Sequence, residues 1–221
     1  MSTHYFKPLI PDNFYHILNR GNNKVHIFCK KENYEYFLKK YDAYLSDYLT
    51  TYAYCLLGNH FHFLVKLNTS TQILKKAEAL EDIPKRLSKF LELEKFDLQE
   101  IAGLIISNQF RKFFMSYAKA INKQENRTGS LFQKNFERLI INNLKYLNNV
   151  IDYIHKNPVY HNFTDDFTDY PYSSYERIMI PKKSKLPKNE ILENFNGKEN
   201  YIKFHSEKHS FSIIEKYIVE L

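Results

Sequence analysis

The stretch from Tyr54 to Lys66 constrains the fold of this chain more than any other. It predicts two β-strands, at about residues 51–57 and 60–67, joined by a corner of Gly58 and Asn59. Successive side chains of a strand face opposite sides of the sheet, so His60 and His62 share one face while phenylalanine, valine and leucine fill the other. A slip of one residue would place both histidines in the core, so the apolar face fixes the strand register.

Two imidazoles on one face of a strand, two residues apart, can bind one divalent ion through their ring nitrogens. The same pair also arises by accident on the solvated face of an amphipathic strand. His60 and His62 therefore do not establish a metal site by themselves, and a second element of the chain has to decide between the two interpretations.

That second element is a helix predicted from Asn142 to Asn157 and ended by Pro158. Tyr153 and Asn157 are four residues apart, so they lie on one face of this helix, beside its apolar stripe. A tyrosine outside the stripe, with an amide one turn later, is available for chemistry. The alternative is a tyrosine at the edge of the core with its hydroxyl in water.

The remaining pattern predicts a strand at 14–20, a helix at 32–48, mostly helical chain at 70–124 and a fourth strand at 132–141. This order is βαββαβ followed by a further helix. We therefore predict an α+β, ferredoxin-like fold with an antiparallel sheet, helices on one face, and an added C-terminal catalytic helix. A charged part of the helical chain, interrupted by Pro84, predicts a helical insertion at about 70–106.

The composition changes after residue 180, where a basic, proline-bounded linker begins. We predict one domain at 1–180 and a linker with short helices at 181–221, near Ile191–Phe195, Tyr201–His205 and Ile213–Val219. The two cysteines, Cys29 and Cys55, have neither metal nor redox spacing. The sequence has no apolar run of membrane-spanning length and no signal-peptide pattern, so we expect a cytoplasmic protein.

The chain carries a formal net charge of +7 and is rich in tyrosine (18) and phenylalanine (18). A basic, aromatic surface suits a polyanion, and nucleic acid is the first candidate. Lysine-rich surfaces are common, however, so charge alone favours nucleic acid only slightly. The candidate phosphate contacts are Arg20, Lys24, Lys134 and Arg138, each of which could equally be an ordinary surface charge.

Four segments of the chain together resemble a known family. They are Tyr15–Asn22, Tyr54–Val65, Tyr153–Val159 and Tyr172–Tyr175. In this order they are similar to the REP-associated tyrosine transposases, which are HUH single-tyrosine transposases of insertion-sequence type. The resemblance covers residues 13–177, approximately, and rests on the order of the four pieces because each is weak alone.

The resemblance implies a ferredoxin-like nuclease domain that acts on single-stranded DNA. His60-Phe61-His62 matches the histidine strand of that family, Tyr153 its nucleophile, and Asn157 the polar residue that completes a Mg²⁺ or Mn²⁺ site. Two features depart from the family. Gly58-Asn59 stands where many relatives have proline, and the helical insertion and the chain beyond residue 180 have no counterpart in the motifs.

We therefore expect a metal-dependent transposase that cleaves and rejoins DNA through a 5′-phosphotyrosine. By resemblance, its target is a hairpin flanked by a single-stranded tetranucleotide, and the protein is a monomer or a homodimer. The alternatives are a catalytically silent nucleic-acid-binding module on the same fold and a relaxase or replication initiator. Tyr117 is the rival nucleophile, although it lies at core spacing in its helix. His155 is expected on another helix face than Tyr153, either supporting the site or at the surface.

Overall fold

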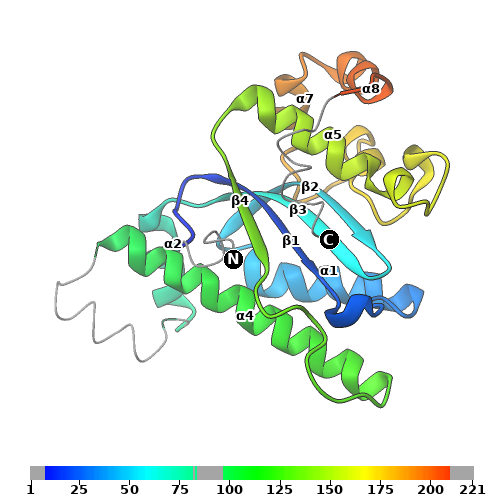
Figure 1. The fold of residues 1–221 in the computed structure, drawn as a ribbon. Helices are drawn as coiled ribbons and strands as arrows, with labels where there is room; N and C mark the ends of the chain where they lie inside the picture. The colour runs from blue at the N-terminus through cyan, green and yellow to red at the C-terminus, as the bar shows by residue number, and fades with distance from the viewer. Residues whose placement is uncertain (1–7, 82, 84–96, 210–221) are drawn as a thin grey trace.

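The protein folds around a four-stranded antiparallel sheet (Figure 1). The computed structural model describes residues 8–81, 83 and 97–209. The strands are β1 (Phe14–Arg20), β2 (Leu49–Leu57), β3 (His60–Leu67) and β4 (Glu137–Ile141). They lie in the order β2-β3-β1-β4, and every neighbouring pair is antiparallel. With the helices between them, this confirms the predicted ferredoxin-like fold.

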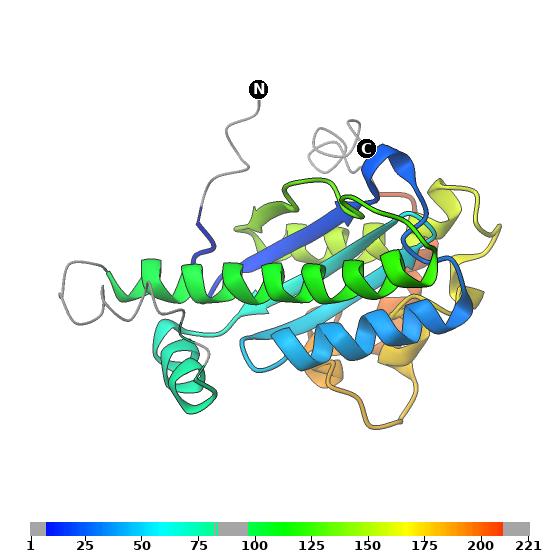
Figure 2. The ribbon, with the colours of Figure 1, turned by 90° about the horizontal axis from the view of Figure 1, so that it is seen from below.

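Three helices cover one face of this sheet: α1 (Lys31–Leu45), α2 (Ser70–Ala79) and α4 (Leu98–Gln124). Helices α1 and α4 run side by side across it (Figure 2). Between them and the sheet lies an aromatic core in which Phe37 contacts Phe61, Phe63 and Phe113. The apolar face predicted for the histidine strand is thus buried, and its register is as predicted.

The opposite face of the sheet is covered by α5 (Leu144–Tyr160) and the chain that follows it (Figure 1). That chain contains α6 (Tyr175–Met179), α7 (Lys188–Asn194) and α8 (Lys198–Ser206). Two short 3-10 turns complete the elements, η2 (Asn22–Lys24) and η3 (Phe167–Asp169). The histidine face of the sheet is therefore the floor of a second core and not a solvated surface.

The fourth strand begins later than predicted, at Glu137 and not at residue 132. Leu18 pairs with Glu137, and Gly21 forms an isolated bridge with Phe132. Three residues therefore separate the two pairs on the side of β1, but five separate them on the side of β4. The extra residues cannot pair and loop out of the sheet. The prediction of a continuous strand over 132–141 was wrong for this reason.

Pro158 does not end α5, contrary to the prediction. The helix continues to Tyr160, and the backbone N–H of His161 still donates to the carbonyl of Asn157 (3.0 Å). Proline removes one N–H and disfavours the helical conformation of the preceding residue, but it stands in the last turn, where few helical bonds remain to be lost. The apolar packing of α5 on the sheet outweighs that cost.

The predicted short helices near 191–195 and 201–205 correspond to α7 and α8, whose Ile191, Phe195 and Tyr201 belong to the same core as α5. The third predicted helix, Ile213–Val219, lies outside the described residues. Residues 84–96 of the predicted helical insertion also lie outside them. The division at residue 180 stays a prediction. In the described part of the chain, no helix has both the length and the apolar character needed to cross a membrane.

Candidate active site

Strand β3, paired with β1, places two imidazoles side by side beneath α5. Arg20 pairs with His60 and Leu18 with His62 in the antiparallel register. The two histidine rings are 5.3 Å apart between centroids, with 5% of His60 and 0% of His62 exposed. They lie on the face predicted from the alternation, but at the bottom of a covered site.

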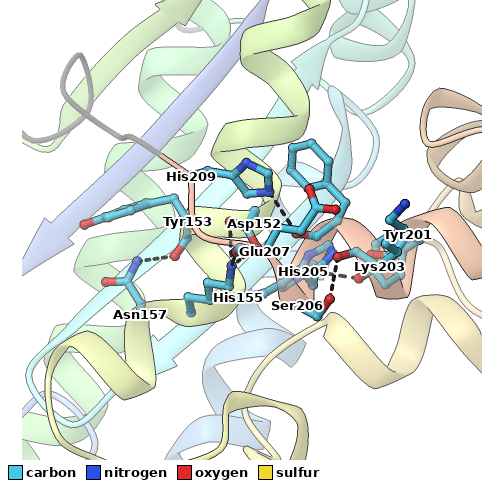
Figure 3. A network of polar contacts seen from close by, with 12 residues as sticks. Asp152, Tyr153, His155, Asn157, Tyr201, Lys203, His205, Ser206, Glu207 and His209 are labelled. Carbon is cyan, nitrogen blue, oxygen red and sulfur yellow. Dashed lines mark hydrogen bonds and ion pairs between the residues drawn. The ribbon is translucent and has the colours of Figure 1, made fainter.

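Helix α5 brings the predicted nucleophile to this pair within one chain. The Tyr153 ring lies 5.9 Å from the His62 ring, between centroids. Asn157 follows one turn later, and both side chains project to the same side of α5 (Figure 3). The amide Nδ2 of Asn157 donates to the carbonyl of Tyr153 (2.9 Å). The structure thus brings Tyr153 against a histidine of the strand and places Asn157 beside it, while the roles of these residues stay predictions.

Hydrogen bonds at Nδ1 orient both imidazole rings. His60 Nδ1 lies 2.7 Å from Asn59 Oδ1, and the amide Nδ2 of Asn59 donates to the carbonyl of Lys24. An amide oxygen only accepts, so His60 Nδ1 carries the proton and Nε2 holds a lone pair. His62 Nδ1 is paired in the same way with His16 Nε2, at 3.0 Å. A proton on His62 Nδ1 would leave its Nε2 free to bind a ligand.

His60 Nε2, His62 Nε2 and Asn157 Oδ1 are buried at this site and have no hydrogen-bond partner. Buried polar atoms are nearly always paired, because an unmade hydrogen bond costs about 1–3 kcal/mol. Two imidazole nitrogens and an amide oxygen are a donor set that fits a divalent ion. The described residues contain no group of three or more His, Cys, Asp or Glu side chains that could hold a metal. An ion here would therefore need the amide, and further ligands from substrate or water.

The site keeps its histidines neutral. Burial, followed by the nearby His161 and Arg20, lowers the pKa of His60 to about 3. Burial and the neighbouring imidazoles hold the pKa of His62 well below its usual value. No carboxylate contributes to either shift. Neutral imidazoles are the form that binds metals, and the local field favours an anion.

Sequence reasoning missed His16 and His161. His16 lies on the same face of β1 as Arg20, and its ring stacks 5.1 Å from that of His62. His161 follows Asn157 by four residues, and its ring lies 4.6 Å from that of His60. The available signals were the alternation of the first strand and the spacing 153, 157, 161. The second was hidden because the helix was expected to stop at Pro158.

Tyr117, the rival nucleophile, belongs to the opposite core. It is fully buried, and its hydroxyl donates to the carbonyl of Ile27 (2.7 Å). Its ring packs on Phe37, so the sheet separates it from the two histidines. Tyr117 is therefore a core residue.

His155 lies on another helix face than Tyr153, as predicted, but it is not at the surface. It is fully buried, and its Nε2 lies 2.8 Å from Ser174 Oγ. Its Nδ1 lies 3.0 Å from His205 Nε2 (Figure 3). Ser174 Oγ in turn accepts from the backbone N–H of Tyr54 in β2. This network joins α5 to α8 and to the sheet.

The four basic candidates do not form one surface. Lys134 and Arg138 line a groove of about 700 Å³ along α4, together with Arg111 and Lys119. Lys24 is exposed in η2. Arg20 is only 8% exposed and lies at the imidazole site. The sequence could not separate these roles because it does not reveal burial.

A second cavity of about 700 Å³ opens next to the tyrosine. Tyr153, Tyr160 and His161 line it from α5 and its end, Phe167 from η3, and Lys208 from the chain after α8. Its aromatic rings and its lysines, Lys156 and Lys208, suit the bases and phosphates of a single nucleic-acid strand, and the carboxylates of Asp165, Asp166 and Glu207 also line it. This cavity offers a substrate room beside the hydroxyl-bearing ring.

Comparison with known proteins finds relatives of one kind. No family model matches the chain. A provisionally assigned REP-associated tyrosine transposase of Haemophilus influenzae is 27% identical over 153 residues, which is 61% of this chain and 73% of that protein. A solved structure of a REP-associated tyrosine transposase bound to a REP hairpin matches with a TM-score of 0.54 and 16% identity, over 81% of this chain and 86% of the other. These findings confirm the resemblance noted in the sequence, and the relatives are enzymes of the predicted class.

Proposed function

We propose, from this confirmed resemblance to the REP-associated tyrosine transposases, that the chain is an enzyme that cleaves and rejoins single-stranded DNA through Tyr153. One observation carries the proposal: the Tyr153 ring lies 5.9 Å from the His62 ring, over a site where three ligand atoms are buried without partners. A phenol, two neutral imidazoles and an amide at one place supply the nucleophile and the ligands that cleavage of a phosphodiester needs.

In the proposed step, the phenolic oxygen of Tyr153 forms a bond to the scissile phosphorus while the bond from phosphorus to the 3′ oxygen breaks. The phenolic proton leaves to solvent, and the 3′ oxygen takes up a proton from water. The products are a 5′-phosphotyrosine and a free 3′-OH. Because one phosphodiester replaces another, a second 3′-OH can reverse the step and join new ends without ATP.

His60, His62 and Asn157 would hold the Mg²⁺ or Mn²⁺ ion, with zinc as a competitor for the imidazoles. When bound, such an ion neutralises charge on the non-bridging oxygens of a phosphate. The chain itself orients the two imidazoles, because Asn59 contacts Nδ1 of His60 and His16 contacts Nδ1 of His62. The Nε2 atom of each ring has no hydrogen-bond partner. The α5 backbone holds Asn157 beside the nucleophile.

Replacing Asn157 with alanine should weaken Mn²⁺ binding at least about tenfold, since removal of groups that support a metal site has effects of 10–100-fold. The measurement is titration calorimetry of Mn²⁺ into protein freed of metal with a chelator, together with the rise in unfolding temperature that binding causes. Asn122→Ala is the control, because that amide bonds to the carbonyl of Gly129 in another part of the molecule. Equal affinity for the parent and for Asn157→Ala would exclude Asn157 as a ligand.

For recognition, we propose that the groove with Lys134 and Arg138 contacts phosphates of a DNA hairpin, and that Lys24 adds an exposed contact. The structural neighbour was solved with a REP hairpin, which supports this class of substrate. The adjacent single-stranded tetranucleotide would lie in the cavity beside Tyr153. All the proposed catalytic groups belong to one chain, so a homodimer is not needed to assemble them.

The test is incubation with hairpin oligonucleotides carrying randomised single-stranded flanks, with Mn²⁺ or with a chelator. The expected product is a protein–DNA band that survives denaturant and appears only with the ion. Binding without any nick or adduct would favour the alternative, a catalytically silent nucleic-acid-binding module on the same fold. If the adduct forms equally well with the chelator, cleavage does not require the metal ion.

A further inference from the structure

Arg20 is a buried cation that forms no ion pair with any described residue. It is the last residue of β1, only 8% of it is exposed, and its Nε has no hydrogen-bond partner. Within the described part of the chain, the ion pairs join other residues and none of them includes Arg20. A buried guanidinium nitrogen without a partner is costly, so a buried arginine is normally found with an anion.

Among the described residues, the titratable groups found beside Arg20 are imidazoles. It pairs with His60 across the sheet, and its charge contributes to the lowered pKa values of both His60 and His161. The His161 ring contacts that of His60 at 4.6 Å. Arg20 and His161 are therefore neighbours of the same imidazole, one on the strand and one at the end of α5.

The position of His161 connects this pair to the substrate space. His161 lines the cavity beside Tyr153, and it lies on the same helix side as Tyr153 and Asn157 by the spacing of four residues. A phosphate in the cavity beside Tyr153 would lie against the His161 ring, which has the His60 imidazole as a neighbour in common with Arg20. The guanidinium fork matches two oxygens of a phosphate, which a point charge such as lysine does not.

We propose that Arg20 and His161 bind the phosphodiester that Tyr153 attacks. Arg20 pairs its guanidinium with a non-bridging oxygen, and His161 donates its ring N–H to the same phosphate. The inference rests on the proposed function and deepens it: Arg20 contacts the reacting group and is not an ordinary contact to the DNA backbone. The pair stabilises the charge that develops on phosphorus-bound oxygens as the new bond forms.

The first test removes the charge from Arg20 and, separately, from the scissile phosphate. Arg20→Gln should slow adduct formation about 10²–10³-fold on an ordinary oligonucleotide at saturating DNA, the effect of losing one such donor. A methylphosphonate at the scissile position replaces the charged oxygen with a methyl group, so Arg20 has no charge left to neutralise. On this substrate the parent and Arg20→Gln should differ by less than about tenfold. Arg177→Gln, which removes an exposed arginine on α6, should match the parent on both substrates.

A purely structural role for Arg20 would not produce this rescue, since a misfolded site stays misfolded whichever phosphate is offered. An equal deficit of Arg20→Gln on both substrates, or no deficit on either, would overturn the assignment. Arg20→Lys keeps the charge but lacks the fork, and we expect an intermediate rate on the ordinary substrate.

The second test needs neither variant nor catalysis. Inorganic phosphate is titrated into the metal-free parent protein while NMR follows the Nε–H of Arg20 and the ring signals of His161. Both should shift and saturate together, and the Nε–H of Arg177 should not move. Absence of the shift would overturn the inference even if adducts form. A saturating shift in a protein that forms no adduct would instead refute the proposed function and leave the anion site standing.

Discussion

Tyr153→Phe is expected to abolish the covalent protein–DNA adduct while hairpin affinity stays within about twofold of the parent, because phosphate contacts dominate affinity. Without the phenolic oxygen, no atom of residue 153 can bond to phosphorus, so the loss should exceed about 10³-fold and reach the detection limit. The measurement pairs a denaturing gel for the adduct with fluorescence anisotropy for binding. The ring itself remains, so its packing beside His62 and His16 should persist.

Tyr117→Phe is the matched control for this substitution. It deletes the hydroxyl that donates to Ile27 and should cost about 1 kcal/mol of unfolding free energy, the typical net value of one hydrogen bond. Its adduct yield should equal that of the parent. An adduct that survives Tyr153→Phe would move the nucleophile to another residue, and one lost only in Tyr117→Phe would point to the opposite face of the sheet.

The metal-free protein should unfold sharply as the pH falls below about 6.5, the ordinary pKa of histidine. Five histidines are at least 95% buried, and burial lowers the pKa of each. They are His16, His60, His62, His155 and His205. Below pH 6.5 the unfolded chain binds protons that the folded chain excludes. The free energy of unfolding then decreases by about 1.4 kcal/mol per pH unit for each group that titrates independently.

One group opposes this trend. Burial raises the pKa of Asp152 to about 6, so the folded chain binds its proton first, and this residue adds stability as the pH falls from 6 toward 4. Five histidines outweigh one aspartate, and a marginal stability of about 5–15 kcal/mol should be exhausted near pH 5. Urea unfolding at several pH values, with a chelator present, measures the slope.

His205→Gln provides the control for acid unfolding, because it removes one titrating group that is not among the proposed metal ligands. The variant should show a slope smaller by about 1.4 kcal/mol per pH unit, although its stability at pH 8 also falls from loss of the bond to His155. A stability that is constant from pH 7 to 5 would mean that the buried rings accept protons without disturbing the fold.

The sequence was sufficient for the sheet and for the faces of its strands. Alternation along 60–67 fixed which side chains face the aromatic core, and the order of elements fixed the topology. The spacing of Tyr153 and Asn157 placed both on one side of α5. These features depend on local periodicity, which is directly visible in the order of residues.

What the sequence did not reveal depends on tertiary contacts. The proline rule predicted the end of α5 three residues early, and that error concealed His161. The segment that loops out between Phe132 and Glu137 depends on where β1 loses its pairing with β4. Whether Arg20 is a surface charge or a buried one depends on how α5 and the end of β1 meet, and composition carries no information about that.

Helix α5 is fastened on both sides. Its apolar residues pack on the sheet, and His155 ties its outer side to α8 through His205. We expect a helix held in this way to keep its position, so that a strand attached to Tyr153 stays where it was captured. When one DNA end is exchanged for another, the DNA would then have to move, while the helix that carries Tyr153 stays in place.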